Sequence, residues 1–173
     1  MKKLLSITCL IFLSLFNFGN ANTKIAFVDM DKIMSTSNPG VSILSQLKNI
    51  NKKNSDTFNN KKKLFKEKED KIVSQKNILT EEEFQLNVNK LRLEIAEYNK
   101  DRNKIISEFN KIKVDNSNKL LKLISPILTK YSEEKEISII LQKKNLIIGK
   151  RELDITNDII KLINNNIKEF KIK

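Results

Sequence analysis

Few residues of this 173-residue chain could carry out covalent or metal chemistry. The chain has no histidine, which removes the usual general base and the commonest metal ligand. Its three glycines are too few for a glycine-rich phosphate loop. Asp29 and Asp31 form an acidic pair, but without further acidic neighbours they are better explained as helix caps and surface charge than as a metal site. The sequence therefore predicts no enzyme, no cofactor and no metal.

Lysine supplies the densest set of charged groups. The chain has 33 Lys+Arg against 21 Asp+Glu, a formal net charge of +12. This surplus suggests an anionic partner: nucleic acid, a membrane surface or an acidic protein. A solvated helix face explains any single lysine as well, and biased codon usage would also enrich Lys, Asn and Ile. The central lysines stand among only three carboxylates and are Lys61, Lys62, Lys63, Lys66, Lys68, Lys71 and Lys76.

Residues 1–21 have the order of a secretory signal peptide. Lys2 and Lys3 precede an apolar run of about 15 residues, which is short for a membrane span. Small residues then end at Ala21, which predicts cleavage before Asn22 and a soluble, cysteine-free mature chain in the periplasm. Export and the lack of an aromatic-basic motif disfavour nucleic acid as the partner.

The segment 41–132 has the pattern of two long helices. Thr80 and Glu83 have the spacing of a capping box, which predicts that one helix ends near Leu79 and another begins at Glu81. On the first helix, apolar or amide residues recur every seven positions, with polar residues between them: Leu44, Asn51, Phe58, Phe65, Ile72 and Leu79. On the second, an a/d heptad seam runs through Phe84, Val88, Leu91, Ile95, Tyr98, Arg102, Ile105, Phe109 and Ile112.

These patterns predict an antiparallel coiled-coil hairpin, or arm, about 55–60 Å long. The main role expected for the four aromatic residues of the arm is packing in its seam, and contact with a partner is a secondary role. These residues are Phe58, Phe65, Tyr98 and Phe109. Pro126 is compatible with a bend where the arm meets its base or with the first turn of a new helix.

The two chain ends, 22–40 and 133–173, are expected to form a small β-rich body. The predicted strands are Lys24–Asp29, Ile137–Gln142 and Leu146–Gly149, and a brief helix over Asp31–Ser37 should end at Asn38-Pro39-Gly40. A closing amphipathic helix, with Asp154 as its N-cap, places five apolar residues on one face: Ile155, Ile159, Ile163, Ile167 and Phe170. The fold class is thus α+β, mostly α.

Such a small sheet would bury little apolar surface and would leave its edges exposed. We therefore expect the body to oligomerise through apolar residues of the strands. The candidates are Ile25, Phe27, Ile139, Leu141, Leu146 and Ile148.

The order of these segments resembles the Skp/OmpH family of periplasmic chaperones. The resemblance rests on a leader followed by Lys24-Ile-Ala-Phe-Val-Asp29, a Lys/Glu-rich hairpin, Pro126-Ile-Leu, and the body segments that end in Leu153-Asp-Ile-Thr156 and Asp158-Ile-Ile160. It implies a homotrimer with helical arms around a cavity that holds unfolded outer-membrane proteins without ATP or any cofactor. The central lysines would then contact these clients, and contact with an anionic membrane surface is a further expectation. The alternative from another class is a structural coiled-coil adaptor or spacer of the cell envelope.

Overall fold

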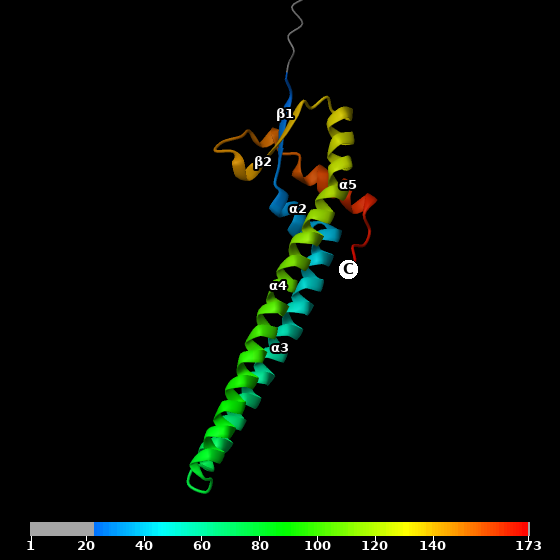
Figure 1. Cartoon of the computed structure of the whole chain (residues 1–173). Coiled ribbons are helices and arrows are strands. Elements are labelled where there is room, and N and C mark those ends of the chain that lie inside the picture. The colour runs from blue at the N-terminus through cyan, green and yellow to red at the C-terminus, as the bar shows by residue number, and fades with distance from the viewer. Residues whose placement is uncertain (1–22, 173) are drawn as a thin grey trace, which may run out of the picture.

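The computed structural model describes residues 23–172, so the predicted signal peptide and its cleavage site lie outside the described residues. Figure 1 shows a small body at one end and a long helical arm projecting from it. The elements follow one another as strand β1 (Ile25–Val28), helices α2 (Met30–Thr36), α3 (Asn38–Ser74) and α4 (Glu81–Glu134), strand β2 (Ile139–Gln142), two 3-10 turns (Lys143–Asn145 and Arg151–Leu153) and helix α5 (Thr156–Asn166).

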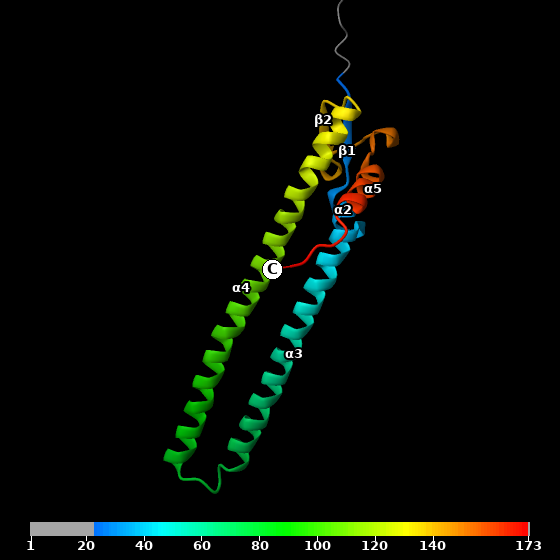
Figure 2. The same ribbon diagram turned by 90° about the vertical axis from the view of Figure 1, so that its right-hand side faces the viewer.

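Helices α3 and α4 run antiparallel along the arm and are joined at its far end (Figure 2). The predicted capping box at the start of α4 is confirmed. The Thr80 hydroxyl accepts a hydrogen bond from the Glu83 backbone N–H at 3.2 Å, and the Glu83 carboxylate accepts one from the Thr80 backbone N–H at 3.0 Å. At 1.5 Å per residue, the 37 residues of α3 give an arm about 55 Å long.

The predicted seam of α4 is confirmed, because all nine of its positions are half-buried. Of the positions predicted at every seventh residue, the four from Phe58 to Leu79 are half-buried, but Leu44 and Asn51, nearer the body, are exposed. There Ile43 and Leu47 are buried instead. The reason is that this end of α3 packs against α5 as well as α4, so its buried stripe is displaced by tertiary contacts that a heptad count does not include. The predicted end of the first helix near Leu79 is wrong, because α3 ends at Ser74 and Leu79 lies in the connecting turn.

The break predicted at Asn38-Pro39-Gly40 lies one residue earlier. Ser37 is the N-cap of α3 and accepts a hydrogen bond from the Gly40 N–H, and Pro39 belongs to the first turn, where its missing N–H costs nothing. Pro126 lies inside the continuous helix α4, so it does not start a new helix. Figure 1 shows α4 changing direction as it reaches the body.

The body is less β-rich than predicted. Strands β1 and β2 form a parallel pair in which Ile25 is opposite Ile139 and Phe27 is opposite Leu141. The prediction of a third strand at Leu146–Gly149 is wrong, because this segment has no strand partner among the described residues. The segment instead crosses over Phe27, and Asp154 then occupies the second edge of β1 through a single bridge.

The hydrophobic core lies at the body end of the molecule. It combines the inner face of the strands with one face of α5 and the adjoining ends of the long helices. The C-terminal segment after α5 closes this core, because the Phe170 carbonyl accepts hydrogen bonds from Ser42 and Gln46 on α3. The buried apolar residues of this cluster are Ala26, Val28, Ile33, Ile43, Leu47, Leu120, Ile124, Ile155, Ile159, Ile163 and Phe170.

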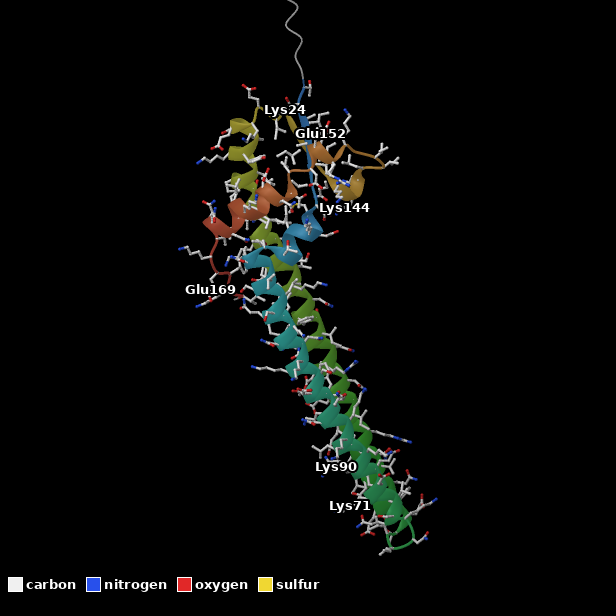
Figure 3. All side chains as sticks on the ribbon, turned by 180° about the vertical axis from the view of Figure 1, so that it is seen from behind. Lys24, Lys71, Lys90, Lys144, Glu152 and Glu169 are labelled. Atoms are coloured by element: carbon white, nitrogen blue, oxygen red, sulfur yellow. The ribbon has the colours of Figure 1, made fainter. Side chains whose placement is uncertain are left out.

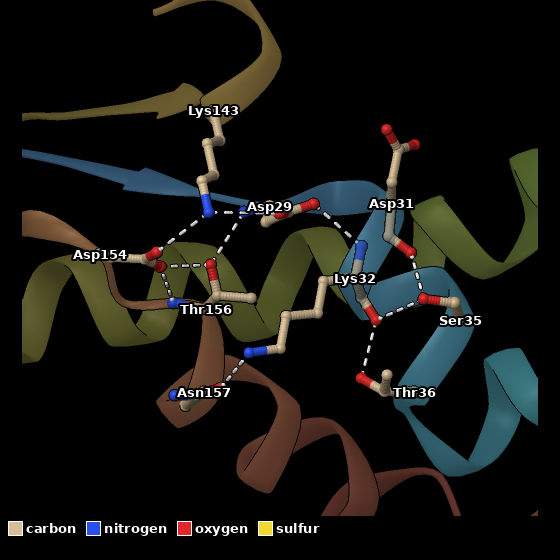
Figure 4. Close-up of polar contacts among 9 residues, drawn as sticks. All are labelled: Asp29, Asp31, Lys32, Ser35, Thr36, Lys143, Asp154, Thr156 and Asn157. Atoms are coloured by element: carbon tan, nitrogen blue, oxygen red, sulfur yellow. Dashed lines mark hydrogen bonds and ion pairs between the residues drawn. The ribbon is translucent and has the colours of Figure 1, made fainter. Parts of the chain in front are cut away.

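A polar junction ties β1 to the start of α5 (Figure 4). Asp29 caps α2 as expected, and its backbone N–H donates to the buried Thr156 hydroxyl at 2.8 Å. The prediction that Asp154 is the N-cap of α5 is wrong, because Ile155 holds that position. The Asp154 carboxylate instead accepts hydrogen bonds from the hydroxyl and backbone N–H of Thr156, and Lys143 bridges it to Asp29.

Candidate functional site

The seven central lysines are all exposed, but they do not share one flank of the arm. On one flank, Lys68 forms an ion pair with Glu94 of α4. Lys71 of α3 and Lys90 of α4 line the same groove between the helices, and Figure 3 shows both near the arm tip. The hydrogen bond from Lys68, aided by nearby Lys90 and Lys61, lowers the pKa of Glu94 despite partial desolvation. Acidic groups of α4 thus partly neutralise this flank.

The other central lysines lie elsewhere on the arm. Lys62 and Lys66 are four residues apart and share the flank opposite Lys68. Lys63 is exposed on α3, and the Lys76 ammonium lies 5.8 Å from the centre of the Phe84 ring at the tip. The structure therefore does not gather the seven residues into one patch.

The charge of the arm belongs to one of its two helices. Helix α3 contains nine lysines against four carboxylates, whereas α4 contains ten cationic and ten acidic side chains. The net positive charge of the arm is therefore carried by α3 and by Lys76 in the connecting turn.

The aromatic residues of the arm lie in the seam, as expected. The Tyr98 ring meets the edges of Phe58 and Phe65, with ring centres 6.4 Å and 5.3 Å apart. Arg102, the polar member of the seam, places its guanidinium 5.3 Å from the centre of the Phe58 ring. Its Nε atom is buried and has no hydrogen-bond partner among the described residues.

An apolar surface near the arm tip was missed by the sequence reasoning. Ile78 in the connecting turn and Leu86 and Leu93 on α4 are 82%, 69% and 72% exposed. A separate apolar groove between the two helices near the tip is lined mainly by Ile72, Val73, Phe84, Val88 and Leu91. The signal was present in the sequence, because Leu86 and Leu93 are seven residues apart and neither belongs to the seam.

The predicted oligomerisation residues fall into three groups. The register of the sheet places Ile25, Ile139 and Leu141 on one face, where all three are exposed. Phe27 shares this face, but its own chain buries it, since Gly149 approaches its ring so closely that a Cβ there would lie 2.9 Å from Cε1. Leu146 is half-buried, and Ile148 is almost fully exposed beside a fully exposed Ile147.

Two findings concern sites that other proteins use for metals and membranes. Among residues 23–172, no three His, Cys, Asp or Glu side chains come together as a metal-binding group would require. Within the same residues, no helix is long and apolar enough to cross a membrane.

Comparisons with known proteins agree with this architecture. The family model described as outer membrane protein (OmpH-like) matches residues 24–163. The fold is similar to the crystal structure of a proposed outer membrane chaperone (OmpH-like) from Caulobacter crescentus, with a TM-score of 0.78 over 88% of this chain and 90% of that chain. At 11% identity this likeness shows the fold. No curated protein matches the chain in sequence at a significant level.

Proposed function

Because the chain belongs to the OmpH-like family, we propose that it is a periplasmic holdase that keeps unfolded outer-membrane proteins from aggregating without ATP. Family membership supports a chaperone-type role. The observation that carries the finer proposal is the arm itself, a projecting hairpin with its positive charge on α3 and uncovered apolar residues at its tip.

The two features of the arm would act at different stages. Charges attract an acidic chain over about a Debye length, roughly 10 Å at 0.1 M salt, and so speed the encounter. Exposed apolar side chains such as Ile78 and Leu86 then contact the alternating apolar residues of an unfolded β-barrel. Capture should therefore weaken with salt, while a salt-resistant affinity remains.

The test is light scattering after a urea-unfolded, acidic outer-membrane barrel is diluted into buffer with the mature protein. We expect protection without ATP that decreases as salt rises from 20 mM to 500 mM. An Ile78→Ser/Leu86→Ser variant should lose most of the protection that survives high salt. Absence of protection by the wild-type protein at every salt concentration would contradict the holdase proposal.

We further propose that the body, rather than the arm, assembles the protein into a homotrimer. The exposed apolar face formed by Ile25, Ile139 and Leu141 supports this, as does the uncovered segment at Ile147 and Ile148. Ile139→Asp should dissociate the assembly, because burying an unpaired charge costs about 3–5 kcal/mol. Sedimentation velocity checks this, with Leu93→Asp on the arm as a control that should leave the assembly intact.

A further inference from the structure

The two flanks of the arm differ in charge more than the sequence order shows. Between Gln85 and Lys122, helix α4 has five carboxylates, separated by three, four, seven and seven residues. This spacing puts all of them on one flank of the helix, the flank that faces Lys68 and Lys71 of α3. They are Glu94, Glu97, Asp101, Glu108 and Asp115. We call this side, with its lysines, the mixed face.

The opposite flank of α4 begins at Arg92, which lines the other groove with Val73 of α3. Residues spaced three, four or seven positions apart lie on the same side of a helix, so this flank continues toward the body. Its further members are Asn99, Asn103, Ile106, Asn110 and Lys113. None of these residues is acidic, and all are exposed.

The matching flank of α3 continues the pattern. Residues spaced alternately four and three positions apart lie on this flank, and none of them is acidic. They are Lys48, Lys52, Ser55, Asn59, Lys62 and Lys66. Asp56 is the one carboxylate of this stretch, and its position two residues before the seam residue Phe58 directs it away from α4. The pattern ends at Glu69, near the tip. We call this side, about 30 Å long, the carboxylate-free face, and its six cations are Lys48, Lys52, Lys62, Lys66, Arg92 and Lys113.

Within residues 23–172, none of these six cations forms an ion pair. On the mixed face, by contrast, Glu94 pairs with Lys68. An acidic chain that approached the mixed face would meet the five carboxylates of α4, whereas one that approached the carboxylate-free face would meet only Glu69, where the face ends near the tip. The two faces therefore attract an acidic partner to very different extents, although both are rich in lysine.

Amide side chains add a second kind of recognition to the carboxylate-free face. Asn59, Asn99, Asn103 and Asn110 are exposed in rows between the cations. Each amide can donate to a peptide carbonyl and accept from a peptide N–H. Such contacts suit a partner with many unpaired backbone groups, which an unfolded polypeptide exposes along its length, whereas a folded protein pairs most of them internally.

We propose that the carboxylate-free face is the surface of the arm that captures an acidic, unfolded polypeptide, and that the mixed face takes little part. This inference rests on the proposed holdase function and specifies the surface through which it acts. The cations set the rate of the encounter, and the amides pair with the extended backbone of the bound chain without reading its sequence.

The decisive experiment compares two charge reversals of equal size on α3. Lys62→Glu/Lys66→Glu alters the carboxylate-free face, and Lys61→Glu/Lys71→Glu alters the mixed face. All four residues are exposed, and both variants lower the net charge by the same amount. Stopped-flow fluorescence would measure association of a labelled, urea-unfolded acidic barrel at 20 mM salt, after circular dichroism and sedimentation have shown that both variants fold and assemble normally.

We expect the first variant to associate roughly tenfold more slowly and the second to change less than about twofold. Asn99→Asp/Asn103→Asp, which adds carboxylates to the carboxylate-free face without changing its shape, should act in the same direction as the first variant. Equal slowing by both lysine variants, or slowing by the mixed-face variant alone, would overturn the inference.

Two further measurements separate this inference from its alternatives. Poly-L-glutamate is an unfolded acidic probe whose association is measurable even if the protein fails to protect a barrel. A face-specific effect on it would support the inference although the holdase proposal had failed. If Lys62→Glu/Lys66→Glu instead abolished binding to vesicles of anionic phosphatidylglycerol and left barrel association unchanged, the face would be a membrane contact and the inference would be wrong.

Discussion

The body and the arm are held together in different ways. Every fully buried apolar side chain of the core cluster lies in the body or at the end of the arm that joins it. Farther out, from Phe58 to the tip, the arm has only half-buried seam residues on each helix. The body thus has a core that excludes water, whereas the arm has one strip of contact between two helices.

This difference indicates where stability resides and bears on the function proposed for the arm. A change in the core should affect unfolding of the whole chain, while a change in the outer arm should affect local opening. Since a surface that captures many different chains must tolerate varied contacts, the loosely held part of the molecule is the part suited to that role. Substitutions matched between the two regions test this division.

The largest expected effect is in the core. Ile159 is fully buried in α5, so Ile159→Ala should lower the free energy of unfolding by about 2–5 kcal/mol, through lost burial and the cavity left behind. Leu91→Ala in the half-buried seam removes a side chain of the same size and should cost about 1 kcal/mol. Urea denaturation followed by circular dichroism would measure both, and equal losses would contradict the division between body and arm.

The next effect concerns the polar junction of the body. Thr156→Val removes the acceptor for the Asp29 N–H and should cost about 1–3 kcal/mol at pH 7. Burial alone would raise the pKa of Asp154, but the hydrogen bonds from Thr156 and the charges of Lys143 and Lys32 hold it below its usual range. The ionised carboxylate therefore stabilises the folded state above the pKa of the unfolded chain, about 3.9, and this stabilisation is lost as the pH falls through the lower folded pKa.

Thr156→Val should consequently lose less stability than the wild type when the pH is lowered from 5 to 2. The matched control is Thr36→Val, since Thr36 is an exposed residue of α2 whose hydroxyl bonds only to the Lys32 carbonyl. Urea titrations at several pH values would measure both variants. An identical acid profile for the wild type and Thr156→Val would show that the junction does not stabilise the ionised form of Asp154.

Local signals predicted most of the arm, and long-range contacts explain the errors. The capping box at Thr80 and Glu83 depends on residues three apart, so the sequence identifies it directly. The heptad count places Leu44 in the seam because it cannot include α5, against which Ile43 and Leu47 pack instead. Leu146–Gly149 has the composition of a strand, but a strand requires a partner, and the second edge of β1 is occupied by Asp154.

The sequence also did not show how charged residues are distributed around the surface of the arm. The lysines were identified as a cluster from their order in the chain, yet Lys62 and Lys68 lie on opposite flanks because six residues are not a whole number of helical turns. The spacing of Glu94, Glu97 and Asp101 could have revealed the acidic flank of α4 from the sequence alone. Which flank of α3 it faces required the pairing of the two helices.

A smaller effect is expected where α4 ends in the body. Glu136 has φ 55°, a left-handed conformation that favours glycine. It follows the C-cap Lys135, and the Ile137 N–H donates to the Ser132 carbonyl at 2.8 Å, as in a Schellman motif. Glu136→Gly should therefore increase the free energy of unfolding by about 1 kcal/mol, which a higher melting temperature would show. Glu136→Ala, which also removes the charge but keeps the Cβ atom, is the control that should show no such gain.

The smallest effect on the whole molecule is expected at the arm tip. Thr80→Ala removes the side chain that caps α4 and should cost about 1 kcal/mol locally. Because the buried core lies at the other end of the molecule, the urea midpoint should hardly move, while amide hydrogen exchange should quicken in the first turns of α4 and the last turn of α3. Thr129→Ala is the matched control, since Thr129 lies within the body end of the same helix and its hydroxyl bonds only to the Ser125 carbonyl. If Thr80→Ala lowered the urea midpoint as much as Leu91→Ala does, the tip would be coupled to global unfolding, and the arm would not be the independently opening region that its single seam indicates.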